Sequence, residues 1–182
     1  SAVSGNWNIV SVGGIDIVTE KSALPMSAPR PEKSGVVSNV TPLTSLVAAN
    51  PELKNKLDES GGWNSDIANS AGVSGKLMRI AHTVEQSLKV ISQGDNAIIT
   101  NNSAKLLVVG KLANELSAKP INEMTSDESL QDVSTKGILA AFNDENVLNT
   151  LSSSEKNSIK LIKGEVANAV STAVKKMTYE IA

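Results

Sequence analysis

The stretch VTPLTSLVAANP at residues 40–51 marks the point where strand-like sequence changes to helical sequence. Thr41 suits a helix N-cap, and Pro42 suits the first helical position, where an N–H would have no partner in any case. Apolar residues then recur every three or four positions, as on the buried face of a helix. The Asn50-Pro51 pair ends this pattern, because proline removes a helix donor and disfavours a helical residue before it. We therefore predict one short helix within this stretch and a second directly after it.

Four further segments carry apolar residues at helical spacing: residues 74–92, 103–117, 127–151 and 153 to near the C-terminus. In chain order, these apolar residues are Leu77, Ile80, Ala81, Val84, Leu88, Ile91, Leu106, Leu107, Val109, Leu112, Leu116, Leu130, Val133, Ile138, Leu139, Phe142, Val147, Leu148, Ile159, Ile162, Val166, Val170, Val174, Met177 and Ile181. The last segment is the clearest amphipathic helix and would be about 40 Å long. The predicted fold is therefore mainly α, a bundle of five to seven helices after a short N-terminal β segment.

Residues 7–19 have the composition of β-strands, with β-branched residues on both sides of the Gly13-Gly14 pair. Glycine pairs are typical of tight turns, so this leader is predicted to be hairpin-like. Its first strand carries apolar residues on both faces, and these form the candidate assembly interface: Trp7, Ile9, Val10 and Val12. Because an isolated two-stranded hairpin is marginal in water, the leader needs a partner. We expect that partner in loops of the helical domain, in a neighbouring β domain or in another copy of the chain.

A connector separates the leader from the helices. Within residues 22–35, the residues typical of a loop or an extended linker are Pro25, Pro29, Pro31 and Gly35. One more short strand, containing Val36, Val37 and Val40, is predicted before the first helix. We therefore divide the chain into a β-rich leader with its connector at residues 1–40 and a helical domain at residues 41–182.

Composition argues against several classes of function. The chain has 182 residues and a formal net charge of −2, without the basic excess of a nucleic-acid binder. No run of about 18 apolar residues occurs, so we expect no membrane span. Cysteine is absent, which rules out disulfides and thiolate metal sites. The chain starts at Ser1 without an initiator Met or a signal peptide, and we expect a processed protein or a fragment.

Catalytic and ligand-binding patterns are sparse. His82 is the only histidine, and a catalytic triad or a zinc site needs further partners. The segment DESGGWNSD at residues 58–66 gathers oxygen ligands but lacks the EF-hand spacing, so we favour a helix-breaking loop, with weak calcium binding as the alternative. Asp16 has the same two interpretations, of which turn geometry is favoured. Since no glycine-rich phosphate loop occurs either, we expect no cofactor and no enzyme activity.

Three motifs together resemble a module of large secreted and cell-surface bacterial proteins. They are GGIDIVT at residues 13–19, SAP at residues 27–29 and VTPLTSLVA at residues 40–48. In that adhesin-like module, a β-sandwich repeat ends in a GG-x-D-x-x-T turn, an apolar-Ala-Pro segment follows, and a PLT-T/S-L-V helix opens a helical region. The match covers residues 12–48, although residues 30–38 are longer and more charged than in the pattern. The resemblance implies a non-catalytic, extracellular part of an adhesin-like or surface-layer-like assembly.

The favoured function is a non-catalytic structural or interaction module at the cell surface or outside the cell. It would assemble through its N-terminal strand with other copies of itself or with neighbouring β domains. Strand complementation of this kind, repeated head to tail, makes a filament. The alternatives are a cofactor-free enzyme that uses Ser, Asp and Glu, and a helical bundle that binds a small ligand. Converging carboxylates would indicate the enzyme, and a large apolar cavity would indicate the ligand-binding bundle.

Overall fold

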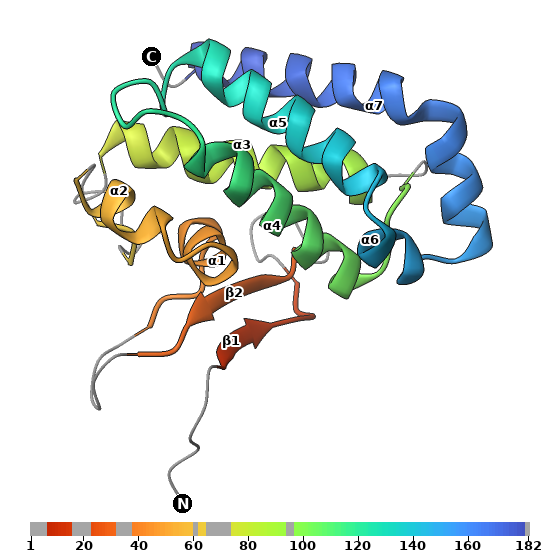
Figure 1. The fold of residues 1–182 in the computed structure, drawn as a ribbon, viewed down its shortest axis with the longest axis horizontal. Helices are drawn as coiled ribbons and strands as arrows, with labels where there is room; N and C mark the ends of the chain where they lie inside the picture. The colour runs from red at the N-terminus through yellow and green to blue at the C-terminus, as the bar shows by residue number, and fades with distance from the viewer. Residues whose placement is uncertain are drawn as a thin grey trace, which may run out of the picture.

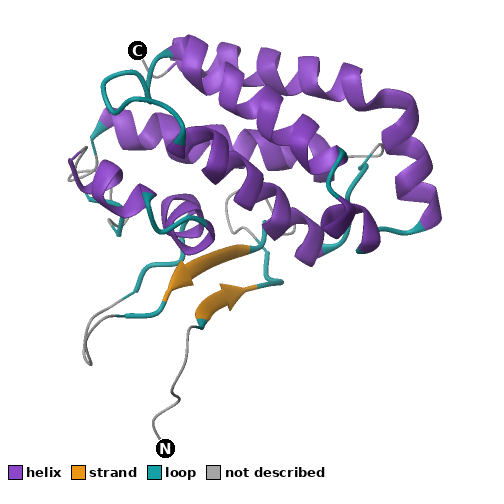
Figure 2. Cartoon of the chain, viewed as in Figure 1, coloured by secondary structure: helices purple, strands orange, loops and turns teal. Residues whose placement is uncertain are grey.

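The structure of the chain, a computed structural model, describes residues 7–15, 23–31, 38–59, 62–64, 74–93 and 97–180. Its elements are β1 (Asn8–Ser11), β2 (Met26–Pro29), α1 (Pro42–Ala49), α2 (Leu53–Glu59), α3 (Gly75–Ser92), α4 (Asn102–Ser117), α5 (Asp127–Phe142), α6 (Glu145–Asn149) and α7 (Ser153–Glu180). Figure 2 shows helices throughout, apart from one small N-terminal sheet. The predicted class, mainly α with a short N-terminal β segment, is confirmed. Seven helices lie in the described residues alone, already the upper limit of the predicted range.

The elements are stacked in the order ribbon, α1, central helices and α7 (Figure 1). The two-stranded ribbon of β1 and β2 lies against α1, which packs on α3 and α4. Next, α5 packs between α4 and α7, while α7 also covers α3. The ribbon therefore lies on the opposite side of the helical body from α7. Within the described part of the chain, no helix combines the length and the apolar character needed to cross a bilayer.

Polar side chains cap the helices where the sequence predicts their starts. Thr41 caps α1 in a capping box with Thr44, and Pro42 takes the first helical position. The caps of α3, α4 and α5 are Ser74, Asn101 and Ser126. Each cap side chain accepts a hydrogen bond from a backbone N–H that the first turn would otherwise leave unpaired. Local sequence therefore determines where these helices begin.

The predicted apolar stripes form one core under the helices. The whole predicted stripe of α3 is buried: Leu77, Ile80, Ala81, Val84, Leu88 and Ile91. On α7, the buried members are Ile159, Val166, Val170 and Val174, while the side chains of Ile162, Met177 and Ile181 lie outside the described set. The core consists mainly of small aliphatic side chains, which lets the helices pack closely.

The stripe of α4 differs from its prediction. Leu107 is exposed and Leu106 is half-buried, whereas Ala104 and Val108 are buried. The reason is that α4 packs against α1 as well as α5, so its buried surface is set by two neighbours. Small residues fit between these helices, and the two leucines are displaced toward the ribbon.

The leader pairs differently from the predicted hairpin. β1 is antiparallel to β2, and the register pairs Asn8 with Pro29, Ile9 with Ala28, Val10 with Ser27, and Ser11 with Met26. The partner strand therefore comes from the proline-containing segment that was predicted to be a connector. The connector was not among the partners expected for the leader, so that expectation missed the strand that pairs with β1.

The glycine pair keeps part of its predicted role. Gly13 and Gly14 have positive φ angles of 79° and 105°, so both adopt turn conformations that favour glycine. They do not join two adjacent strands, because the connection between β1 and β2 runs from residue 12 to residue 25. Val40 lies in no strand. Residues 16–19 with Asp16, and the predicted strand residues Val36 and Val37, lie outside the described residues.

Candidate interaction site at the edge of the ribbon

The outer edge of β2 is bonded to α1. The Ser27 N–H donates to Ser45 Oγ at 2.8 Å, and the Ser27 C=O accepts from Thr44 Oγ1 at 2.9 Å. Both hydroxyl-bearing residues of α1 are fully buried. Two motifs of the resemblance, SAP and VTPLTSLVA, are therefore joined directly by hydrogen bonds.

These hydrogen bonds determine which way the main chain of β1 faces. In an antiparallel pair of strands, opposite residues alternate between pairs that exchange both hydrogen bonds and pairs that exchange none. Because both main-chain groups of Ser27 face α1, its partner Val10 belongs to a pair that exchanges none. By the same alternation, Asn8 also belongs to a pair that exchanges no hydrogen bonds, and its partner Pro29 has no N–H to donate. The N–H and C=O groups of Asn8 and Val10 therefore point away from β2.

The two edges of the ribbon are thus unequal. On β2, Pro29 offers no donor, and its C=O accepts from Ser38 Oγ at 3.3 Å. Pro25 and Pro31 stand at even spacing from Pro29 and continue the same edge. On β1, no described residue outside the ribbon bonds the main chain of Val10. Proline and covering helices are common ways to protect a sheet edge, so β2 has a closed edge and β1 an open one.

The open edge consists of the outward main chain of Asn8 and Val10, extended by Val12 directly after the strand, and its surroundings are apolar. Val10 and Val12 are 51% and 56% exposed, and Ile15 beyond the glycine pair is 70% exposed. The segment WNIVSVGGI, which carries these residues, contains no charged side chain. Charged residues often protect a free edge from association, and this segment lacks them.

A groove of about 580 Å³ runs along one face of the ribbon. Its lining includes Asn8, Val10, Ala48, Leu106, Leu107 and Lys111, from β1, α1 and α4. Asn8 Nδ2 donates to Ala48 O at 3.4 Å and links the strand to the end of α1. The ammonium of Lys111 forms an ion pair with Asp144 and is thereby neutralised. The groove therefore offers apolar surface directly beside the open edge.

The structure places three of the four predicted interface residues in exposed positions on this ribbon. Trp7, Val10 and Val12 are exposed, and the guanidinium carbon of Arg30 lies 5.5 Å from the centre of the Trp7 ring. Ile9 is half-buried, and its main chain faces β2. Ile9 therefore belongs to the inner side of the ribbon rather than to the open edge.

His82 lies on the surface of α3 beside a carboxylate. Its Nδ1 is 3.5 Å from Glu85 Oε2, and Lys89 Nζ is 2.6 Å from the other oxygen of Glu85. The hydrogen bond with His82, aided by Lys89, lowers the pKa of Glu85 to about 2 although burial opposes the shift. A catalytic base also needs a nucleophile or a substrate proton within hydrogen-bond reach, and among the described residues the polar partner of His82 is Glu85.

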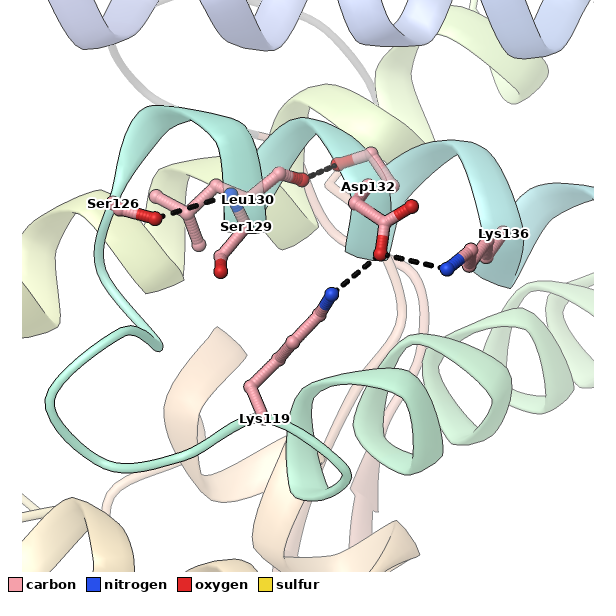
Figure 3. Close-up of polar contacts among 7 residues, drawn as sticks. Lys119, Ser126, Ser129, Leu130, Asp132 and Lys136 are labelled. Carbon is pink, nitrogen blue, oxygen red and sulfur yellow. Dashed lines mark hydrogen bonds and ion pairs between the residues drawn. The ribbon is translucent and has the colours of Figure 1, made fainter.

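Other carboxylates also hold structural positions. Figure 3 shows Asp132 of α5 between two lysines, with Lys119 Nζ at 2.5 Å and Lys136 Nζ at 3.0 Å. These contacts, that of Lys119 first, lower the pKa of Asp132. The same figure shows Ser126, whose hydroxyl accepts from the Ser129 N–H at the start of the helix. Asp132 therefore ties α5 to the end of α4.

Glu155 joins the start of α7 to the segment before α4. One carboxylate oxygen accepts from the N–H and the hydroxyl of Thr100, both at 2.9 Å, and the other accepts from the N–H and the hydroxyl of Ser152, both at 2.8 Å. Partial burial raises the pKa of Glu155, but these four hydrogen bonds outweigh it and lower the pKa to about 2.

Metal ligands do not gather in the parts of the chain that are described. No group of three or more His, Asp or Glu side chains there could hold a metal ion. Residues 60–61 and 65–66 of the candidate calcium loop lie outside the described residues, as does Asp16. Weak calcium binding at these positions stays a prediction.

Comparisons of the chain with protein-family models, with curated proteins and with solved structures find no match. The resemblance to adhesin-like modules therefore rests on the three motifs themselves. The geometry of the ribbon is an independent basis for a proposal about function.

Proposed function

We propose that the chain is a non-catalytic structural or interaction module of a secreted or cell-surface protein, and that it associates through the open edge of β1. The inequality of the two ribbon edges carries this proposal. β2 is closed by prolines and by hydroxyls of α1, whereas β1 presents outward N–H and C=O groups beside exposed valines. An extended segment of another copy or of a neighbouring β domain can add to such an edge through main-chain hydrogen bonds.

Two further observations support the proposal. The carboxylates with lowered pKa values are bonded to lysines, to a histidine or to caps, so they stabilise the fold instead of converging on a reaction centre. In addition, two of the three motifs that resemble adhesin-like modules, SAP and VTPLTSLVA, meet at one contact, where Ser27 bonds to Thr44 and Ser45. The expected location outside the cell follows from that resemblance.

Strand addition can be tested with an extended peptide and two variants of Val10. The probe is a synthetic peptide of alternating Thr and Val, titrated into the ¹⁵N-labelled chain while backbone amide signals are recorded. We expect shifts at Asn8, Val10 and the groove residue Leu107. Val10→Pro removes the outward N–H and should weaken binding at least about tenfold, whereas Val10→Thr keeps the N–H and should bind as the wild type does.

Two results would contradict the proposal. One is the absence of any amide shift near β1 at millimolar peptide in a chain that also stays monomeric. The other is binding that Val10→Pro leaves unchanged, because the contact would then not involve the main chain of β1. The variants' amide spectra also report whether the helices remain folded, so that a loss of binding is not confused with unfolding.

A further inference from the structure

We infer that the open edge of β1 pairs with the same edge of a second copy, antiparallel and centred on Val10, so that the chain forms a closed dimer. This inference rests on the proposed function and specifies the partner. It follows from the positions of the outward residues along β1, from their lack of charge and from the closed edge of β2.

The spacing of the outward residues makes the open edge complementary to itself. The outward positions are Asn8, Val10 and, by continued alternation, Val12. In an antiparallel pair centred on Val10, this residue bonds to its own counterpart. Asn8 of each copy then meets Val12 of the other. All three outward residues find hydrogen-bond partners in this register, whereas a shift of the centre leaves one of them without an equivalent.

Side chains in this register do not oppose the pairing. The segment WNIVSVGGI has no charge, so two copies approach without like-charge repulsion. The exposed Trp7 of one copy lies toward Gly13 of the other, where no side chain obstructs the indole ring. Figure 1 shows β1 at the margin of the molecule, with β2 between it and α1, and the side chains of Val10 and Val12 are exposed.

The closed edge of β2 limits the assembly to two copies. The shared sheet would have the strand order β2, β1, then β1 and β2 of the second copy. Both of its outer edges are β2, where Pro29 has no N–H and Ser27 is bonded to Ser45. An interface in which the same patch serves both partners closes upon itself, whereas a filament needs two different patches. The ribbon therefore supports a dimer and not the filament expected from the sequence.

Single-cysteine variants test both the partner and the register, because the natural chain has no cysteine. Residues of a hydrogen-bonded antiparallel pair have Cα atoms about 5.5 Å apart, within reach of a disulfide. Val10→Cys should therefore form a disulfide-linked dimer on mild oxidation. Asn8→Cys should stay monomeric, because the two copies of that residue would be about 14 Å apart. A mixture of Asn8→Cys and Val12→Cys should form the crossed dimer, and Ser154→Cys on α7 is the remote control.

Sedimentation of the reduced wild type gives the assembly size. The mass should rise with concentration from 19.0 kDa to twice that value and then stop, and Val10→Pro should remain monomeric. Continued growth beyond a dimer, or crosslinking of Asn8→Cys in preference to Val10→Cys, would overturn the inference. A strictly monomeric chain whose Val10 amide still responds to the Thr-Val peptide would overturn the dimer but leave the proposed function standing. A monomer whose Val10 amide signal does not shift with the peptide would overturn both the dimer and the proposed function.

Discussion

Replacing Ser45 with alanine tests the contact between the ribbon and the helical body. The substitution removes the acceptor of the Ser27 N–H, which lies 2.8 Å away in a buried contact. A buried donor left without a partner costs about 1–3 kcal/mol, while alanine gains about 0.5 kcal/mol over serine within a helix. We therefore expect Ser45→Ala to lower the free energy of unfolding by about 0.5–2.5 kcal/mol.

Urea unfolding followed by circular dichroism measures this loss, and a cycle of variants assigns it. In a chain that begins at Val40, Ser27 is absent, so Ser45→Ala should change the free energy of unfolding by less than about 0.5 kcal/mol. Ser92→Ala is the matched control in the full chain, because its hydroxyl donates to Leu88 O of its own helix at 2.6 Å. Its effect should also stay within about 0.5 kcal/mol.

An equal loss on Ser45→Ala in the full and the shortened chain would refute the reasoning, because the loss could then not involve Ser27. The shortened chain also tests the predicted division at residue 40. Retention of most of the helical signal would show that the helices fold alone. If the shortened chain does not fold, the ribbon belongs to the core and that division is wrong. In that case the full chain with Ser27→Pro replaces the shortened chain in the cycle, because this substitution removes the Ser27 N–H itself. In the Ser27→Pro background, Ser45→Ala should again change the free energy of unfolding only slightly.

Three further predictions concern the helical core and its charges. Gly137→Ala should lower the free energy of unfolding by about 1–2 kcal/mol, because its Cβ would lie 2.6 Å from Leu112 Cδ2 and 3.2 Å from the Cα and N atoms of Leu112. A Leu112→Ala background removes the first contact and keeps the two backbone contacts, so it should reduce this loss without abolishing it; an undiminished loss would contradict the reasoning. With its pKa lowered from 4.5 to about 2, the Glu155 carboxylate stabilises the fold above pH 4.5, and this stabilisation disappears as the pH falls toward 2. When the free energy of unfolding is measured from pH 4.5 down to pH 2, the wild type should therefore lose about 1 kcal/mol more than Glu155→Gln does. Identical pH dependence of the two free energies would contradict this. Val170→Asp buries a charge and should lower the free energy of unfolding by at least about 3 kcal/mol. Lys176→Asp, at an exposed position of the same helix, should lower it by less than about 0.5 kcal/mol. Equal effects would mean that the α7 stripe does not face the core.

The helices could be predicted because their signals are local. Thr41 and Pro42 define the start of α1 through hydrogen bonds and geometry within one turn. The spacing of apolar residues likewise placed the buried face of α3 without knowledge of its neighbours. Leu107 shows the limit of such a prediction, because helix periodicity does not determine which of several apolar residues the surrounding helices will bury.

The partner of β1 could not be found in the same way, because prolines signal loops and sheet edges alike. Pro25, Pro29 and Pro31 are spaced by even numbers, so in an extended chain they lie along one edge. That spacing was the available signal for a strand with a closed edge. The hydroxyls of α1 that complete this edge are distant in sequence, so their role depends on the fold.

The difference between the closed edge of β2 and the open edge of β1 is the main support for the proposal that β1, and not the helical body, makes the functional contact. A free edge is a hazard for any sheet, and a charge or a proline is enough to block it. β2 has both proline and hydroxyl partners, whereas the neighbouring strand, a few ångströms away, has valines and no charge. The carboxylates of the helices, such as Asp132 and Glu155, are meanwhile engaged in contacts between elements. Protection of one edge alone fits the proposed closed dimer, because a second open edge would allow continued growth, and two closed edges would allow no pairing through the ribbon at all.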